Sequence, residues 1–131
     1  LRLLDELCRD HGAALLLISH DLGLVRQLCE RVLVMYAGRV VEQAATGILL
    51  QQPAHPYSRA LLACAPELGR PDKPLNPIPG QPPPLNELVS GCHFAPRCEY
   101  AQPPCRSGEI PLRLFGAEHE VRCIRAEEIN R

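Results

Sequence analysis

The chain has 131 residues, of which 46% are hydrophobic, and this length and composition are typical of one modest globular domain rather than of a disordered chain. It contains no run near the ~18 to 20 apolar residues that a membrane-spanning helix needs, and it does not begin with the basic and then apolar pattern of a signal peptide. Its net charge of −1 gives no electrostatic reason to expect nucleic acid as a partner.

The first thirty residues predict a helix, a buried strand and a second helix. The first helix is already under way at Leu1, so we expect the chain to be a fragment of a longer protein; its apolar face consists of Leu3, Leu4, Leu7 and Cys8. The run Ala13–Ser19 is short, apolar and preceded by a glycine, which predicts a strand buried on both faces, as in a parallel sheet. Residues 21–31 return to helical spacing, with Ser19 or Asp21 as the N-cap.

A β-hairpin is predicted next. Residues 32–36 and 39–43 are rich in β-branched and other apolar residues. Only Ala37-Gly38 separates them, which is the spacing of a tight two-residue turn in which glycine readily supplies a positive φ.

Two short helices are expected after the hairpin. Thr46 is a candidate N-cap for a helix that continues through Leu50. A second helix is expected to begin near Pro56, because proline suits the first helical position, and to end near Cys64. We expect Tyr57 to pack back on the hairpin.

The remaining sequence predicts a stiff connector followed by an irregular segment. Eight of the nineteen residues in 66–84 are proline, which favours an extended chain without internal hydrogen bonds. Residues 91–105 carry cysteines, prolines and arginines, with too little apolar content to form a core of their own. Residues 126–131 are expected to form a polar tail.

Four cysteines in this irregular region require either disulfide bonds or a metal centre, and their spacing is C-x₅-C-x₆-C-x₁₇-C: Cys92, Cys98, Cys105 and Cys123. The other three of the seven cysteines lie in apolar surroundings, a usage that suits a reducing compartment and favours a metal over disulfides. The spacing lacks the paired C-x₂-C knuckles of structural zinc sites, so zinc is the second choice. A four-iron four-sulfur cluster accepts four thiolates at irregular spacing.

Five motifs in a fixed order resemble the C-terminal part of the ATP-binding subunit of ABC transporters, in particular the oligopeptide/dipeptide importers, whose relatives also serve nickel uptake. Together these motifs extend over nearly the whole chain. They are Ile18-Ser19-His20-Asp21-Leu22, residues 34–42 of the hairpin, residues 55–62 beginning His-Pro-Tyr, Ile78-Pro79-Gly80, and the cysteine segment 91–105.

This resemblance implies an α/β fold. Residues 1–45 would form the C-terminal end of a P-loop ABC nucleotide-binding domain, and residues 46–131 would form a small irregular Pro/Cys-rich extension. The 131 residues contain no phosphate loop, no Ser-Gly-Gly-Gln signature and no Asp-Glu strand. We therefore expect the full-length subunit to be an ATPase that uses ATP and Mg²⁺, and these residues alone to be inactive.

The resemblance implies that His20 is a catalytic residue that contacts the γ-phosphate of ATP. The predicted strand before His20 would place its imidazole at the edge of the sheet where ligands bind. A helix-capping role is the alternative interpretation of His20. Asp21 fits a cap or first-turn acid better than it fits a general base.

The resemblance further implies that the four cysteines hold a four-iron four-sulfur cluster. Arginines beside them, Arg97 and Arg106, would either offset its negative charge or be solvated, and His93 and His119 are alternative ligands.

The implied partners are two permease subunits, a second ATP-binding subunit and, indirectly, a substrate-binding protein, with the subunit peripheral to the cytoplasmic face of the bacterial inner membrane. The function implied is energising di- or oligopeptide import. The alternative is a non-enzymatic metal-binding or redox-sensing module.

Overall fold

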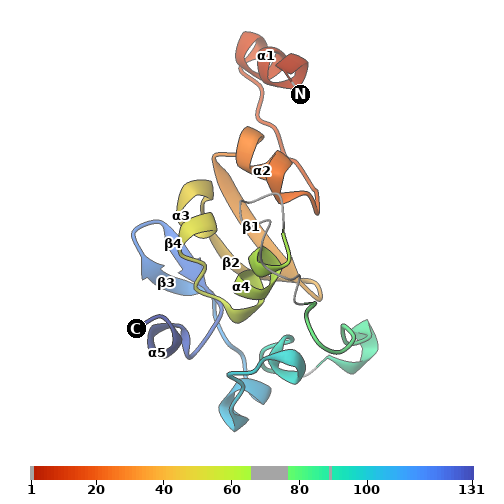
Figure 1. Ribbon diagram of the computed structural model, residues 1–131, viewed down its shortest axis with the longest axis vertical. Coiled ribbons are helices and arrows are strands. Elements are labelled where there is room, and N and C mark those ends of the chain that lie inside the picture. Colours follow the sequence, from red (N-terminus) through yellow and green to blue (C-terminus); the bar gives the residue numbers. More distant parts are fainter. Residues whose placement is uncertain (1, 66–76, 89) are drawn as a thin grey trace.

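A four-stranded antiparallel sheet forms the centre of the fold in the computed structural model, which describes residues 2–65, 77–88 and 90–131 (Figure 1). The strand order is β1-β2-β4-β3, with β1 (Arg31–Tyr36), β2 (Arg39–Ala45), β3 (Arg113–Gly116) and β4 (His119–Val121). The α-helices are α1 (Arg2–His11), α2 (Leu22–Leu28), α3 (Thr46–Gln51), α4 (Pro56–Ala63) and α5 (Ala126–Ile129). Single 3₁₀ turns are η2 (Leu85–Glu87), η3 (Ala95–Arg97) and η4 (Pro103–Arg106).

The predicted hairpin is confirmed. β1 and β2 pair antiparallel, with Tyr36 opposite Arg39 across a two-residue turn. Ala37 and Gly38 have φ of 44° and 79°, and positive φ at both central residues defines the type I′ turn that matches the twist of paired strands. The register shifts between Val34 and Met35, so β2 carries one extra residue at that point.

One face of the hairpin forms the main core. Along β1 the side chains alternate between exposed and buried, and the buried ones are Val32, Val34 and Tyr36. Residues from α2, α3 and the cysteine segment pack on this face, Phe94 among them. The ring of Tyr57, at the start of α4, lies 4.7 Å from that of Tyr36, as predicted. Burial of this apolar face holds α2, α3 and α4 against the sheet.

The predicted strand at 13–19 is wrong, and so is the parallel sheet that it implied. These residues have no regular secondary structure and connect α1, which stands away from the rest of the molecule, to α2 (Figure 1). Leu16 is 85% exposed and Ile18 is 91% exposed. A strand needs a neighbour to bond its N–H and C=O groups, and the sheet in the described part of the chain does not extend to this segment.

The exposed apolar segment leads to a first prediction. A chain of residues 1–131 is expected to self-associate, because 13–19 offers unpaired backbone groups and apolar side chains to another copy. The double substitution Leu16→Asp with Ile18→Asp should shift it towards monomer in sedimentation velocity. Gln52→Asp with Gln81→Asp adds the same charge at exposed polar positions and should change little. Equal association of the two double variants would contradict a role for the segment.

The C-terminal part of the chain is more ordered than expected. β4 pairs with β2, so the sheet continues across the boundary predicted near residue 45. The predicted polar tail at 126–131 is wrong: Ala126 is fully buried in α5, and the guanidinium of Arg59 donates to the carbonyl oxygen of Ile129 at 3.0 Å. Asn130 in turn donates to the carbonyl oxygen of Ala54 at 3.1 Å. These bonds dock the end of the chain beside α4.

The helix ends follow the sequence only in part. Asp21 is the N-cap of α2, its carboxylate accepting from the N–H of Leu24 at 3.0 Å, as predicted. Thr46 is not a cap, because its hydroxyl donates to the carbonyl oxygen of Cys29 instead.

Of the predicted connector, residues 66–76 lie outside the described residues, and residues 77–84 contain no helix or strand. No helix in the described part of the chain is long and apolar enough to cross a membrane.

Candidate functional site

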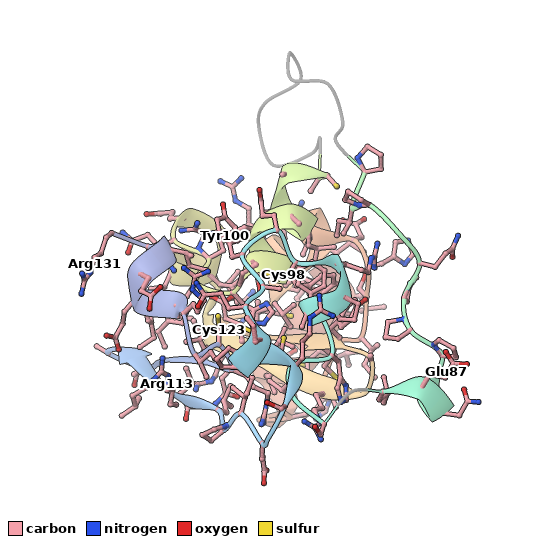
Figure 2. All side chains as sticks on the ribbon, turned by 90° about the horizontal axis from the view of Figure 1, so that it is seen from below. Glu87, Cys98, Tyr100, Arg113, Cys123 and Arg131 are labelled. Atoms are coloured by element: carbon pink, nitrogen blue, oxygen red, sulfur yellow. The ribbon has the colours of Figure 1, made fainter. Side chains whose placement is uncertain are left out.

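All four predicted cysteines line a single pocket. Its wall also contains His55 and several apolar and aromatic side chains. Cys98, Tyr100 and Cys123 lie close together on the underside of the molecule, where the cysteine segment meets the C-terminal part of the chain (Figure 2). Residues up to 31 positions apart in the sequence, Cys92 and Cys123, thus come together. The sequence prediction of the four residues as one group agrees with this geometry.

Successive tight turns position three of these cysteines. The N–H of Cys92 donates to the carbonyl oxygen of Cys105 at 2.8 Å, which closes the segment into a loop. The prolines of η3 and η4 stand at the start of these single turns, where a missing N–H costs nothing. Gly91 is required for closure, because a Cβ there would lie 2.4 Å from the carbonyl oxygen of Cys105.

Cys123 follows β4, so pairing of the sheet brings it to the pocket. The guanidinium of Arg125 donates to the carbonyl oxygen of Tyr100 at 2.7 Å and ties the two segments together. The pocket is therefore bounded by the cysteine segment on one side and the end of the sheet on the other.

The cysteine segment is anchored by residues that its composition did not predict. Phe94 is 2% exposed, and its ring meets that of Tyr36 edge to face at 5.2 Å. The Nδ1–H of His93 donates to the carbonyl oxygen of Ala37, in the hairpin turn, at 2.9 Å. One buried aromatic therefore joins to the main core a segment that was expected to have too little apolar content for a core of its own.

Burial raises the pKa of three of the pocket thiols. Desolvation is the largest cause for Cys92, Cys98 and Cys123, and the pKa of Cys98 rises to about 11. Mutual repulsion adds to the effect, because each ionised thiol would face the sulfurs of the others. Four thiolates in this pocket therefore need positive charge to balance them.

The structure shows no ready-made site for a single metal ion in the residues that it describes. Within 2–65, 77–88 and 90–131, no group of three or more His, Cys, Asp or Glu side chains is placed to hold one. The four cysteines are not joined by disulfide bonds.

His55 is a pocket residue that the sequence analysis did not identify. It is 1% exposed and is the N-cap of α4, its Nδ1 accepting from the N–H of Tyr57 at 3.0 Å. Its Nε2 lies 3.9 Å from the sulfur of Cys92. Burial lowers the pKa of His55 to about 4, so the imidazole is neutral. The His-Pro-Tyr sequence fitted a helix start well enough to conceal this second contact.

The arginines and histidines considered as charge partners or ligands have other contacts. Arg97 donates to the carbonyl oxygens of Ile78 and Pro79 at 2.8 and 2.7 Å, which holds the described end of the connector against the cysteine segment. Arg106 is exposed and does not line the pocket. The Nε2–H of His119 donates to Glu42 at 2.7 Å. Neither His93 nor His119 lines the pocket.

A buried carboxylate, also not anticipated from the sequence, joins the parts that surround the pocket. Glu42 in β2 is fully buried and accepts from His119 and from two backbone N–H groups, those of Ala54 at 2.6 Å and His55 at 2.9 Å. It thereby connects the hairpin, β4 and the chain entering α4. Three donated hydrogen bonds satisfy the buried carboxylate of Glu42 without water.

His20 lies apart from the cysteine pocket. It is exposed, in the linker just before α2, and it does not line the pocket. The linker and the cysteine segment lie towards opposite ends of the molecule (Figure 1). The hydroxyl of Ser19 accepts from the N–H of Asp21 at 3.0 Å, and together with the Asp21 cap this fixes the backbone around His20.

Comparison with known proteins adds two findings. Residues 41–105 match the model of the family "Oligopeptide/dipeptide transporter, C-terminal region". The chain is 41% identical to the oligopeptide transport ATP-binding protein OppD of Salmonella typhimurium over 96% of its own length, and 42% identical to the oligopeptide transport ATP-binding protein AppD of Bacillus subtilis over 98%. It spans 37% and 39% of the lengths of these two relatives. The family match includes His55 and three of the four pocket cysteines, but neither His20 nor Cys123.

Proposed function

Residues 41–105 belong to the oligopeptide/dipeptide transporter C-terminal region family, and from that premise we propose that this chain is the C-terminal part of an ATP-binding subunit that energises peptide import. The observation that carries the proposal is the identity of about 42% over nearly the whole chain to oligopeptide transport ATP-binding proteins. The comparisons lend no support to the alternative of a stand-alone metal-binding module. The chain has an α/β fold with an antiparallel sheet, which agrees with this assignment.

In the full-length subunit, His20 is proposed to donate a hydrogen bond to the γ-phosphate of ATP. What supports this role is its exposed position on a backbone fixed by Ser19 and Asp21. ATP and Mg²⁺ would be held mainly by the part of the subunit that carries the phosphate loop, since these 131 residues contain none. His20 would orient the attacking water and stabilise charge that develops in the transition state. Asp21, which is occupied as a cap, would take no part in the chemistry.

The four pocket cysteines are proposed to hold a four-iron four-sulfur cluster, with zinc as the alternative. One observation supports the fit: all four thiols line one pocket. A cubane presents four ligand sites at separate corners, and each of these thiolates could take one of them. The cluster would supply positive iron centres that balance the thiolates, and burial otherwise opposes the ionisation of three of these thiols, Cys92, Cys98 and Cys123.

We assign the pocket a structural role. Cys92, Cys98 and Cys105 come from the cysteine segment, whereas Cys123 follows β4, so ligation by all four would bind two separate parts of the chain to each other. The buried Phe94 and the apolar pocket wall would exclude water from the thiolates. The cysteines would in this way fix the extension against the hairpin of β1 and β2.

The proposed assembly follows from the same family. It consists of this subunit, a second ATP-binding subunit and two permease subunits on the cytoplasmic face of the membrane, with a substrate-binding protein delivering the peptide. The direct experiment is peptide uptake in cells whose gene for the full-length subunit is deleted. Uptake of a labelled di- or oligopeptide should be lost and should return with the wild-type gene. Unchanged uptake of every peptide tested, together with no peptide-stimulated ATP hydrolysis by the reconstituted assembly, would overturn the proposal.

A second prediction concerns the cysteines. Replacing any one of Cys92, Cys98, Cys105 or Cys123 by serine should abolish the broad visible absorption of the cluster and expose sites within 90–125 to limited proteolysis, because ligation supplies local folding free energy. The region around His20 should be cleaved at the same rate as in the wild type. Cys8→Ser, which lies on α1, is the matched control and should have no effect. Retained absorption in all four variants would contradict the ligand assignment.

A further inference from the structure

His55 carries two hydrogen-bonding nitrogens that face different parts of the structure. Nδ1 accepts from the N–H of Tyr57 at 3.0 Å and caps α4. Nε2 lies 3.9 Å from the sulfur of Cys92, within the pocket that all four cysteines line. The ring is 1% exposed, so water does not compete for either nitrogen.

The cap fixes the tautomer of the imidazole. A backbone N–H can only donate, so Nδ1 must have a free lone pair, and the proton of the neutral ring must then be on Nε2. This N–H faces the sulfur of Cys92, which is its hydrogen-bond acceptor.

Capping alone does not account for a histidine at this position. Asparagine, aspartate and serine are the preferred N-cap residues, and each would accept from Tyr57 with a smaller side chain. The imidazole instead fills space between α4 and the pocket, where its ring also lies 6.1 Å from that of Phe94. The larger ring adds a donor on the far side of the cap, facing a sulfur.

We propose that His55 is a positioning residue for the cysteine centre: its Nε2–H donates to the sulfur of Cys92 and makes the bound cluster easier to reduce. This inference rests on the cluster proposed above. A donor to a ligand sulfur stabilises the state with more negative charge, and such hydrogen bonds are one of the means by which a protein sets the potential of an iron–sulfur cluster. His55 also joins the pocket to the hairpin, because its own N–H donates to the buried carboxylate of Glu42 at 2.9 Å.

Two variants of the full-length subunit separate the donor from the cap. His55→Asn keeps an N-cap acceptor but is too short to reach Cys92, and His55→Phe keeps a ring but removes both functions. Both should shift the midpoint potential of the cluster to more negative values in an anaerobic spectroelectrochemical titration. His11→Phe is the control, since it replaces an imidazole by the same ring at the exposed end of α1, and it should leave the potential unchanged.

The tautomer is tested separately by ¹⁵N NMR of histidine-labelled protein without the cluster, where His55 should carry its proton on Nε2. The midpoint potential does not depend on the fraction of chains loaded, so partial loss of the cluster in a variant leaves the comparison intact. An unchanged or more positive potential in both His55 variants, or a proton on Nδ1, would overturn the role of His55 while the cluster stands. Wild-type protein without iron and sulfide would overturn the cluster, and this inference with it.

Discussion

His20→Ala in the full-length subunit is expected to lower the rate of ATP hydrolysis by ~10² or more while ATP binding is nearly unchanged. Binding should persist because the phosphate loop, outside these residues, would supply most of the contacts to the nucleotide. Turnover should fall because the proposed hydrogen bond from the imidazole to the γ-phosphate would strengthen as charge develops in the transition state. The measurement is steady-state ATP hydrolysis beside equilibrium binding of a non-hydrolysable ATP analogue.

The control for this experiment is His11→Ala. His11 is also exposed and ends α1, only nine positions before His20 in the sequence, but nothing assigns it a contact with nucleotide. The His11→Ala variant should hydrolyse ATP at the wild-type rate. Wild-type turnover by His20→Ala would remove His20 from the mechanism, and an equal loss of binding and turnover would indicate a structural role.

Glu42→Leu is expected to cost ~3–5 kcal/mol of stability in the sheet, the range for removing one partner of a buried charged network. The substitution leaves the N–H groups of Ala54 and His55 and the Nε2–H of His119 without an acceptor and without water. Because β2, β4 and the chain entering α4 meet at this carboxylate, the loss should spread to the cysteine pocket. Hydrogen exchange of the amides in β2 and β4 should become faster by ~10² or more.

The matched substitution is Glu128→Leu. The carboxylate of Glu128 is 59% exposed and pairs with Arg125 at 2.9 Å on the surface of α5. A surface pair of this kind contributes ~0–1 kcal/mol, so exchange in β2 and β4 should barely change. Equal effects of the two substitutions would show that Glu42 does not hold these elements together.

Local sequence chemistry was sufficient for the hairpin and for α4. The Ala37-Gly38 spacing predicted a two-residue turn, and Pro56 predicted the start of α4, because in both cases the decisive residues are neighbours in the chain. The strands β3 and β4 were not predicted, since they have only four and three residues and much of their stability comes from pairing of β4 with β2. The strand expected at 13–19 failed for the same reason, because its partners could not be read from its own residues.

In the candidate site too, some residues could be identified from the local sequence and others could not. The four cysteines could be identified as one group because an irregular, polar segment rarely keeps four thiols without a use. The contact of His55 with Cys92 joins residues 37 positions apart, and a helix start explained the histidine without it. The role of Glu42 could not be predicted from the sequence for the same reason. Its three donors come from two other segments of the chain, and nothing in the sequence of β2 marks it as buried.

The proposed role of the pocket depends most directly on what its four cysteines bind. The full-length subunit should therefore be purified without oxygen and analysed for iron, acid-labile sulfide and zinc. We expect about four irons and four sulfides per chain, and less than one zinc. One zinc per chain without sulfide, or no metal with the four cysteines joined as two disulfides, would contradict the proposed centre.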